Sequence, residues 1–373
     1  MTDNIEELRK ALGDEIPKYM NTDFHLARWL KANKNNVNDT IKKFKKYLLI
    51  RQCYKCDNDT YFENFYDNTE IINFRKIFSQ SICDINWYNT KDNALIFVES
   101  AVHDTSSVTK SIRINDYVRI FFTCCEYFQR VLLEYEKING KKSSGICIFD
   151  MSNFSLMNYT NPVSAINKMY ESRIDIWLNY YSELLKKVII VNGPRIMSLS
   201  WKVLSILLPS EVHDRFMFAN SLPYDLEKSL SIDCIPKAFG GTKYIENCLP
   251  NCCNIVSNLK GKEFTKSGDI WLKEKITPPK ALTIYLSPGE KLKETFHVKK
   301  NQKLIYEFYC NRDYTLKITL NDSILLNPDI KLSTPVLSAE DCFKIPESGI
   351  VKLELTNLSK LIKMSGKLTV VIV

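Results

Sequence analysis

Residues 187–241 read KVIIVNGPRIMSLSWKVLSILLPSEVHDRFMFANSLPYDLEKSLSIDCIPKAFGG. The continuous apolar run 188–191 predicts a strand buried on both faces, as in a parallel sheet. Residues 192–194, Asn-Gly-Pro, end that strand, because glycine permits unusual dihedral angles and proline is favoured where a helix begins. Residues 196–208 are apolar on almost every side, which predicts a helix that is buried or faces another apolar surface. This segment is too short to cross a bilayer, which needs about 20 apolar residues.

The second half of this stretch predicts another helix and a closing turn. Pro209 and Ser210 indicate a helix start, and the helix carries the charged residues 213–215 beside the apolar residues 216–218. Ile-Pro at 235–236 and Gly-Gly at 240–241 close the unit. This order of buried strand, Asn-x-Pro turn, apolar helix, basic helix and Ile-Pro…Gly-Gly exit resembles the CRAL-TRIO lipid-binding family. The resemblance implies a lipid cavity in which the helix over 196–208 acts as the gate.

The composition indicates a folded protein of two or three domains. The chain has 373 residues, of which 45% are hydrophobic and 25% charged, unlike a disordered chain. No basic and apolar leader precedes Thr2, and no apolar run reaches the length of a membrane span, so we expect a cytoplasmic protein. The 12 cysteines lack the spacing of a disulfide framework, so we expect free, buried thiols in a reducing compartment.

Residues 1–60 are predicted to form a helical lobe. Asp23 is the candidate N-cap of one helix, and Ile41, Phe44 and Leu48 recur at spacings of three and four residues in a second helix. The string LARWLKANKNNVNDTIKKFKKYLLIRQ is similar to the helical lobe that precedes the lipid-binding domain in the CRAL-TRIO family.

Positive charge is concentrated in this lobe. Residues 28–55 contain nine Lys or Arg and one acid, Asp39, and the whole chain has a net charge of +8. The basic surface either meets anionic lipid, at roughly 1 kcal/mol per cation, or is a solvated helix face, and the sequence leaves both open. Nucleic acid is not expected as a partner, because no aromatic platform or recognised motif accompanies the charge. The candidate membrane-facing residues are Lys42, Lys43, Lys45 and Lys46.

Residues 61–246 alternate predicted strands with predicted helices, which indicates an α/β domain with a mainly parallel sheet. Residues 94–99 and 145–149 are short candidates for buried strands. Residues 116–136 predict a long helix, whose charges fall on one stripe and whose other faces are expected to be buried. The residues of that stripe are Arg119, Glu126, Arg130 and Glu134.

A second amphipathic helix is predicted over 162–180, with Asn161 as its N-cap and Pro162 at its first position. Aromatic stripes on such helices most often pack in a protein core. One small sheet, however, hardly requires this helix, the helix over 116–136 and the apolar helix over 196–208. We therefore expect an apolar pocket between these helices and the sheet.

The C-terminal third changes character. Residues 247–280 predict a polar connector, and residues 281–373 contain short strands at regular spacing, which is typical of an antiparallel β-sandwich. The predicted strands are 283–286, 292–298, 304–310, 315–320, 351–356 and 367–373. The segments SPGEKLKETFHVKKNQKLIYEFYC and PESGIVKLELTNLSKLIKMSGKLTVVIV resemble a GOLD domain, and the domain order is similar to that of supernatant protein factor and its relatives. The resemblance is weakest over 321–345.

The sequence shows no assembled catalytic or metal site. The four histidines are scattered, and neighbours on one helix such as His213 and Asp214 do not create a nucleophile–base geometry. Cys53 and Cys56 have the spacing of a zinc ligand pair, and Cys248, Cys252 and Cys253 are candidates for the remaining ligands, but no properly spaced second pair follows. We therefore expect a protein that is not an enzyme and that carries no metal or cofactor.

The resemblance implies a headgroup site at Glu183 and Arg215, because a Glu and a Lys at the matching positions hold the inositol phosphate in the exchange proteins of the family. Arginine keeps the positive charge and favours bidentate phosphate binding. The alternative is an ordinary ion pair between surface elements. Gly145 and Cys147 stand where phosphatidylcholine binders place hydroxyls, which argues against choline recognition. The candidate pocket and gate residues are Phe121, Phe128, Leu132, Ile196, Leu199, Trp201, Leu204, Ile206, Leu207, Phe216 and Phe218.

The predicted function is the binding and transfer between membranes of a hydrophobic lipid, either a phosphoinositide or an apolar isoprenoid-type molecule. Contact with the membrane would be peripheral and transient. One alternative is a trafficking adaptor that senses lipid and uses the GOLD domain to bind a protein partner. Another is a lipid-dependent activator of a membrane enzyme.

Overall fold

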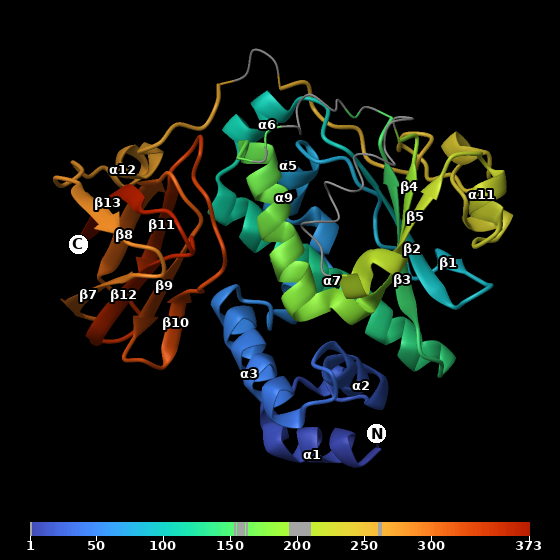
Figure 1. Ribbon diagram of the computed structural model, residues 1–373, viewed down its shortest axis with the longest axis horizontal. Helices are drawn as coiled ribbons and strands as arrows, with labels where there is room; N and C mark the ends of the chain where they lie inside the picture. Colours follow the sequence, from blue (N-terminus) through green and yellow to red (C-terminus); the bar gives the residue numbers. More distant parts are fainter. Residues whose placement is uncertain (1, 153, 155–160, 162, 194–209, 260–262) are drawn as a thin grey trace.

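The computed structural model describes residues 2–152, 154, 161, 163–193, 210–259 and 263–373 (Figure 1). It has an N-terminal group of helices, a central five-stranded sheet with helices on both sides, and two four-stranded sheets at the C-terminus. The candidate gate helix over 196–208 lies outside the described residues. That segment contains the candidate pocket residues Ile196, Leu199, Trp201, Leu204, Ile206 and Leu207.

The N-terminal region is helical, as predicted. Its helices are α1 (Thr2–Leu12), α2 (Asp23–Ala32), α3 (Val37–Cys53), α4 (Asp59–Glu63) and α5 (Thr69–Arg75). The N-cap of α2 is Thr22 rather than Asp23, because the Thr22 hydroxyl accepts a hydrogen bond from the backbone N–H of His25. Asp23 lies in the first turn instead, where a negative charge is favourable near the helix N-terminus.

The central sheet is mainly parallel, as predicted, with the strand order β1-β2-β3-β4-β5. Strands β2 to β5 are parallel, and the short β1 pairs antiparallel with β2, so the sheet as a whole is mixed. The strands are β1 (Tyr88–Asn89), β2 (Ala94–Ser100), β3 (Ser144–Asp150), β4 (Leu185–Val191) and β5 (Phe216–Ala219).

Strand β5 corrects one prediction from the sequence. The sequence predicts that Phe216–Phe218 continue a helix, but the structure has a short 3-10 helix, Ser210–Arg215, followed by a strand. Phe216 pairs with Val188 of β4, and Ala219 pairs with Val191. Without β5, the edge of β4 would expose unpaired backbone donors and acceptors, so ladder pairing outweighs the local helical pattern.

Two helices cover one side of the sheet and separate it from the C-terminal strands (Figure 1). They are α7 (Ile114–Asn139) and α9 (Ala165–Ile176), and α9 continues as a wider helical turn over Trp177–Tyr181. The prediction that Asn161 caps this helix is wrong, because the Ser164 hydroxyl accepts the hydrogen bond from the first turn. The predicted first helical residue, Pro162, lies outside the described residues. The shorter helices of this part are α6 (Thr105–Ser111) and α11 (Tyr224–Glu227).

The two faces of the central sheet have different roles. Side chains alternate along each strand, so every second residue points to the same face. One face packs in a closed core against residues such as Trp87, Leu226 and Phe239. This packed face consists of Ala94, Ile96, Val98, Ile146, Ile148, Ile189, Val191, Met217 and Ala219. The intervening residues point toward α7 and α9, and we call this side the open face.

The C-terminal part is an antiparallel β-sandwich of two sheets with the orders β10-β9-β12-β7 and β11-β8-β13-β6. All six predicted strands are present: β6 (Leu282–Leu286), β7 (Lys291–Val298), β8 (Lys303–Cys310), β9 (Tyr314–Leu320), β12 (Gly349–Asn357) and β13 (Met364–Ile372). Two further strands, β10 (Ile324–Asn327) and β11 (Ala339–Lys344), lie within 321–345. The helix α12 (Asp269–Glu274) lies within the predicted connector.

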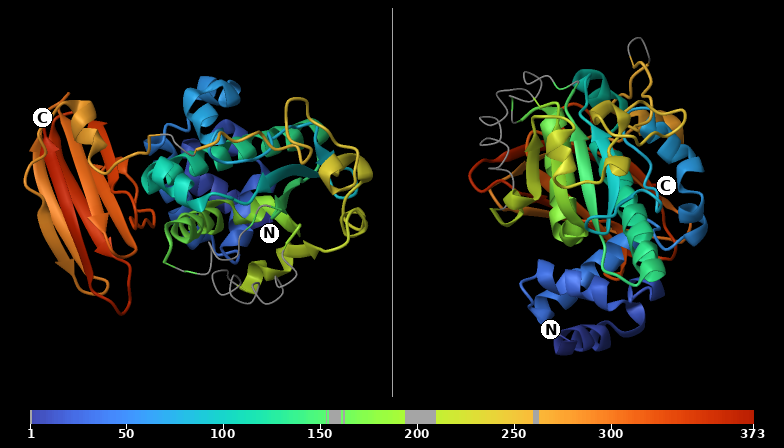
Figure 2. Two further views of the ribbon diagram at one scale, coloured as in Figure 1. Left: turned by 90° about the horizontal axis from the view of Figure 1, so that it is seen from above. Right: turned by 90° about the vertical axis from the view of Figure 1, so that its right-hand side faces the viewer.

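The sandwich packs beside the α/β part, as the left view of Figure 2 shows. Lys46 of α3 forms an ion pair with Asp329 at 2.8 Å, and Asn115 of α7 donates a hydrogen bond to the backbone carbonyl of Glu340 at 2.9 Å. Arg113, just before α7, reaches the carboxylate of Glu340 at 2.8 Å. The sandwich is therefore tied to both the helical lobe and the long helix of the sheet domain.

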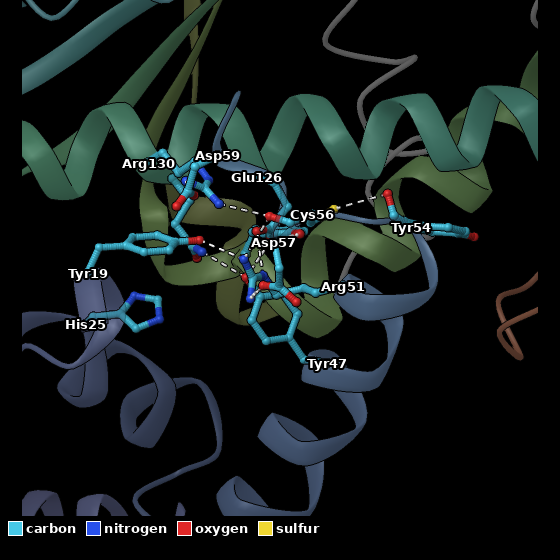
Figure 3. A network of polar contacts seen from close by, with 12 residues as sticks. Tyr19, His25, Tyr47, Arg51, Tyr54, Cys56, Asp57, Asp59, Glu126 and Arg130 are labelled. Atoms are coloured by element: carbon cyan, nitrogen blue, oxygen red, sulfur yellow. Dashed lines mark hydrogen bonds and ion pairs between the residues drawn. The ribbon is translucent and has the colours of Figure 1, made fainter. Parts of the chain in front are cut away.

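A buried network of polar side chains joins the helical lobe to α7 (Figure 3). The carboxylate of Glu126 is fully buried, although the sequence pattern groups it with the charged stripe of α7. It accepts hydrogen bonds from the Arg51 guanidinium at 2.7 Å, from the Tyr181 hydroxyl at 2.7 Å and from the Tyr47 hydroxyl. Because a buried charge is tolerated only when it is paired and hydrogen-bonded, these contacts fix α3 and the end of α9 on α7.

A second buried ion pair joins α2 to the end of α7. Arg28, which is 3% exposed, pairs with Glu136 and donates a hydrogen bond to the backbone carbonyl of Ser143 at 2.8 Å. Arg28 and Arg51 are therefore not part of a basic surface. By contrast, Lys42, Lys43, Lys45 and Lys46 are all exposed on α3.

Breaking the Arg51–Glu126 pair should destabilise the fold strongly. Arg51→Met leaves the Glu126 carboxylate buried without its cation, so we expect the free energy of unfolding, measured by urea denaturation, to fall by about 3–5 kcal/mol. The double variant Arg51→Met/Glu126→Gln removes both charges but keeps an acceptor for the two tyrosines, and most of the stability should return. Lys45→Met, which loses an exposed ion pair with Glu15, is the control and should cost less than about 1 kcal/mol. A double variant as unstable as Arg51→Met would contradict this explanation.

Candidate functional site

A cavity of about 340 Å³ lies between the open face of the sheet and the helices α5, α7 and α9. The sheet contributes the residues that alternate with the packed face, and the helices contribute mainly aromatic rings. The open-face residues that line it are Phe97, Glu99, Cys147, Phe149, Val188, Ile190 and Phe216. Pockets for small molecules have volumes of roughly 300–1,000 Å³ and mostly apolar walls, so this cavity fits a small apolar ligand.

The predicted pocket residues that the structure describes fall into two groups. Phe121 and Phe128 of α7 and Phe216 of β5 line the cavity. Leu132 is fully buried in the helical core and does not line it. Phe218 is on the open face of β5, where it packs near Met151 and Ile190, but it is also outside the lining.

Four cysteines line this cavity: Cys83, Cys124, Cys125 and Cys147. Burial raises the pKa of Cys83 to about 12 and raises the pKa values of the other three as well. The thiols are therefore neutral near pH 7, and a neutral thiol is a poor nucleophile and a poor metal ligand. They act here as small apolar wall groups.

No group of three metal-binding side chains is present among the described residues. Of the sequence's candidate zinc ligands, Cys53 contacts the backbone carbonyl of Leu326 on β10. Cys252 and Cys253 are buried against the packed face of the sheet. In the described part of the chain, no helix is long and apolar enough to span a bilayer.

Glu183 and Arg215 meet at the amino ends of two neighbouring strands, as a direct result of the sheet topology. Glu183 comes just before β4 and Arg215 just before β5, and these strands are parallel neighbours. An Nη atom of Arg215 is 2.5 Å from Oε1 of Glu183, and the other Nη donates a hydrogen bond to the carbonyl of Leu185 at 3.0 Å. Arg215 lines the cavity, whereas Glu183 does not.

Lys31 completes this group, and sequence reasoning missed it. Its Nζ lies 2.7 Å from Oε2 of Glu183, across the contact between α2 and the turn before β4. Burial raises the pKa of Glu183, but the hydrogen bonds from Lys31 and Arg215 outweigh burial, so the pKa lies below its usual value. Two cations around one carboxylate leave a net charge of about +1, which can attract an anionic group.

An ion pair in the cavity wall was also not predicted. Arg173 of α9 pairs with Glu99 of β2, and its guanidinium carbon lies 4.7 Å from the centre of the Phe121 ring. Burial opposes the charged form of Arg173, but the interaction with Glu99 outweighs it and holds the pKa of Arg173 above its usual value. Glu99, Arg173 and Arg215 are the only charged residues among those described that line the cavity.

The chain is similar to several known proteins. Residues 79–241 match the family model of the CRAL/TRIO domain. The chain is 25% identical, over 98% of its length, to the CRAL-TRIO domain-containing protein C34C12.6 of Caenorhabditis elegans, and covers 93% of that protein. It is 24% identical, over 64% of its length, to F28H7.8 of the same species, a protein of the same description, and covers 57% of it. The crystal structure of Sfh5 covers 74% of this chain and 96% of its own, with 16% identity and a TM-score of 0.44.

Position 145 of β3 should require glycine, because the Phe128 ring of the cavity wall occupies the space of a larger side chain. A Cβ atom at position 145 would lie only 2.5 Å from Cζ of Phe128. We therefore expect Gly145→Ala to lower the free energy of unfolding, measured by urea denaturation, by about 1–3 kcal/mol through overpacking. Adding Phe128→Leu should restore part of the loss, and Phe128→Leu alone serves as the reference. A Gly145→Ala variant as stable as the unmodified chain would show that the ring shifts freely.

Proposed function

We propose that this protein binds a hydrophobic lipid in the cavity and transfers it between membranes, because residues 79–241 match the family model of the CRAL/TRIO domain. The observation that carries the proposal is the apolar, aromatic-lined cavity between the open face of the sheet and α7 and α9. Burial of an alkyl chain there would stabilise the complex by about 0.8 kcal/mol per CH₂ group. The mechanism is non-covalent, and it requires no metal, cofactor or catalytic residue.

The finer part of the proposal concerns the lipid headgroup. We propose that Lys31 and Arg215 bind a phosphate group, with Glu183 contacting the hydroxyls of an inositol ring. The support is the excess positive charge of this group and the position of Arg215 in the cavity wall. Arginine can bind phosphate through two parallel hydrogen bonds. In the structure, Arg215 pairs with Glu183, and a headgroup phosphate would have to replace this ion pair.

Two further parts of the hypothesis concern exchange with membranes. The segment 196–208 would act as a lid that opens at the bilayer, and this segment lies outside the described residues. The exposed lysines of α3 would contact anionic lipid, in a peripheral and transient manner and on the cytoplasmic side.

A trafficking adaptor remains the second candidate, and the sandwich supplies the observation that favours it. Several large apolar side chains of the C-terminal sandwich are exposed, including Leu361 in the connection between β12 and β13 at 88% and Tyr285 of β6 at 75%. Exposed apolar groups of this kind often mark a protein-binding surface. If this part is a GOLD domain, it would bind a protein partner while the cavity senses lipid.

A vesicle-to-vesicle transfer assay separates the two candidates. Donor vesicles that carry a fluorescent phospholipid are mixed with acceptor vesicles, and the full chain is added in catalytic amount. A transfer protein accelerates exchange, whereas an adaptor does not. Native mass spectrometry of the purified chain then identifies the bound molecule. A chain that carries no lipid and accelerates no exchange would refute the proposed function.

Arg215→Ala should abolish phosphatidylinositol transfer while sparing an apolar ligand held in the same cavity. Loss of a hydrogen bond between charged groups costs roughly 1.5–3 kcal/mol, which corresponds to about 10- to 150-fold in affinity. Glu183→Ala should act in the same direction, but more weakly. Lys186→Ala, which removes an exposed cation of β4 that pairs with Asp92 between β1 and β2, is the matched control. If the Arg215 and Glu183 variants unfold at lower temperature and lose all ligands alike, the pair is structural.

The α3 lysines should contribute unequally to binding of anionic vesicles. Lys45 and Lys46 are already paired with Glu15 and Asp329, whereas Lys42 and Lys43 form no ion pair with any described residue. At about 1 kcal/mol per cation, Lys42→Ala/Lys43→Ala should weaken vesicle binding roughly 30-fold, and Lys45→Ala/Lys46→Ala should weaken it less. Binding, measured by vesicle sedimentation, should also fall steeply as salt rises, because exposed charges are screened. If both double variants bind vesicles as tightly as the unmodified chain, the lysines of α3 do not contact the membrane and form a solvated helix face.

A further inference from the structure

The Arg173–Glu99 pair is a second polar position in the cavity, distinct from the group at Glu183 and Arg215. Glu99 is on β2 and is level with Phe149 of β3 and Ile190 of β4, whereas Arg215 precedes β5. Three strand spacings separate β2 from β5, which amounts to about 14 Å. A headgroup phosphate at Arg215 therefore does not reach this pair. The pair needs a different explanation.

The pair presents both hydrogen-bond donors and an acceptor to the cavity. Arg173 and Glu99 both line it, and they keep 25% and 13% of their side-chain surface accessible. The Phe121 ring lies against the Arg173 guanidinium, and the guanidinium also pairs with the Glu99 carboxylate. These contacts hold the guanidinium in place on the cavity wall, beside a carboxylate that accepts hydrogen bonds.

The chemistry of the pair selects among possible ligand groups. A hydroxyl both donates and accepts, so it can donate to Glu99 and accept from Arg173 without adding charge to the cavity. A carboxylate would place a second anion beside Glu99, and burial of an uncompensated charge is costly. A pure hydrocarbon would cover the polar groups of the pair without replacing any hydrogen bond.

We propose that the Arg173–Glu99 pair binds the hydroxyl group of a neutral lipid alcohol whose apolar body fills the rest of the cavity. This inference rests on the proposed lipid-binding function, and it names one class of ligand for that cavity. A lipid alcohol and an anionic phospholipid would use different polar positions of one cavity. They would therefore compete through their apolar parts alone.

The test compares three ligands that share one alkyl chain: hexadecan-1-ol, hexadecanoate and hexadecane. Binding to the full chain is measured by competition against a fluorescent lipid that the cavity holds. Because hydrogen bonds to charged groups carry the discrimination, we expect the alcohol to bind about 10- to 100-fold more tightly than either of the other two. Equal affinity for all three ligands would refute the proposal.

Two variants test the role of the pair directly. Glu99→Gln leaves Arg173 without its counter-charge, so the preference should change from the alcohol to hexadecanoate. The double variant Arg173→Met/Glu99→Met makes this part of the wall apolar, and the alcohol should then bind no better than hexadecane. Replacement of a buried ion pair by apolar residues is often neutral for stability, so this variant is expected to fold. Circular dichroism and thermal unfolding verify that both variants are folded.

The controls separate this inference from the proposed function. Lys186→Ala should leave the preference for the alcohol unchanged, because Lys186 pairs with Asp92 and does not line the cavity. If no alkyl ligand binds to the unmodified chain, the lipid-binding function itself fails. If all three bind but Glu99→Gln keeps the preference for the alcohol, the cavity binds lipid and the role of the ion pair is refuted.

Discussion

The buried carboxylate of Glu126 is the interaction on which the arrangement of this molecule depends. A charge with no exposed surface is stable only if its surroundings supply a counter-charge and hydrogen bonds. Here these come from different elements, since Arg51 and Tyr47 belong to α3 and Tyr181 follows α9. The helical lobe, α7 and α9 are thereby held in one relative position. Because α7 and α9 form the wall opposite the sheet, the cavity exists only while this position is kept.

The fold was largely predictable from the sequence because its strands are apolar segments at recognisable spacing. The parallel strands β2, β3 and β4 and six sandwich strands follow from such segments. β11 does not, because it contains Glu340, whose carboxylate is buried and accepts hydrogen bonds from the backbone of Gly268 and Ile270. A charged residue in a strand suggests an exposed loop when its partners are unknown. β5 was also missed, because four residues are too few to show a period of two.

Residues of the site could be predicted only where one continuous segment of the sequence contains the whole pattern. Phe121 and Phe128 belong to an apolar helix face, which the sequence shows directly. The Arg173–Glu99 pair joins residues 74 positions apart, and a single sequence contains no information about such contacts. The same limit explains Glu126, since a stripe of charges on a helix looks identical whether it faces water or a buried arginine. Positions in a pattern give the period of an element but not the chemistry of its neighbour.

The alternation of packed and open faces in the central sheet has an evolutionary consequence. Neighbouring residues such as Ile148 and Phe149, or Ile189 and Ile190, lie on the same strand but face the closed core and the side of the cavity, respectively. Substitutions on the packed face are tested by selection for folding, whereas those on the open face change the shape of the cavity while leaving the core intact. Ligand preference can therefore diverge between relatives without passing through unfolded intermediates. For protein engineering, the same strands offer a set of alternate positions at which a pocket can be reshaped on a constant scaffold.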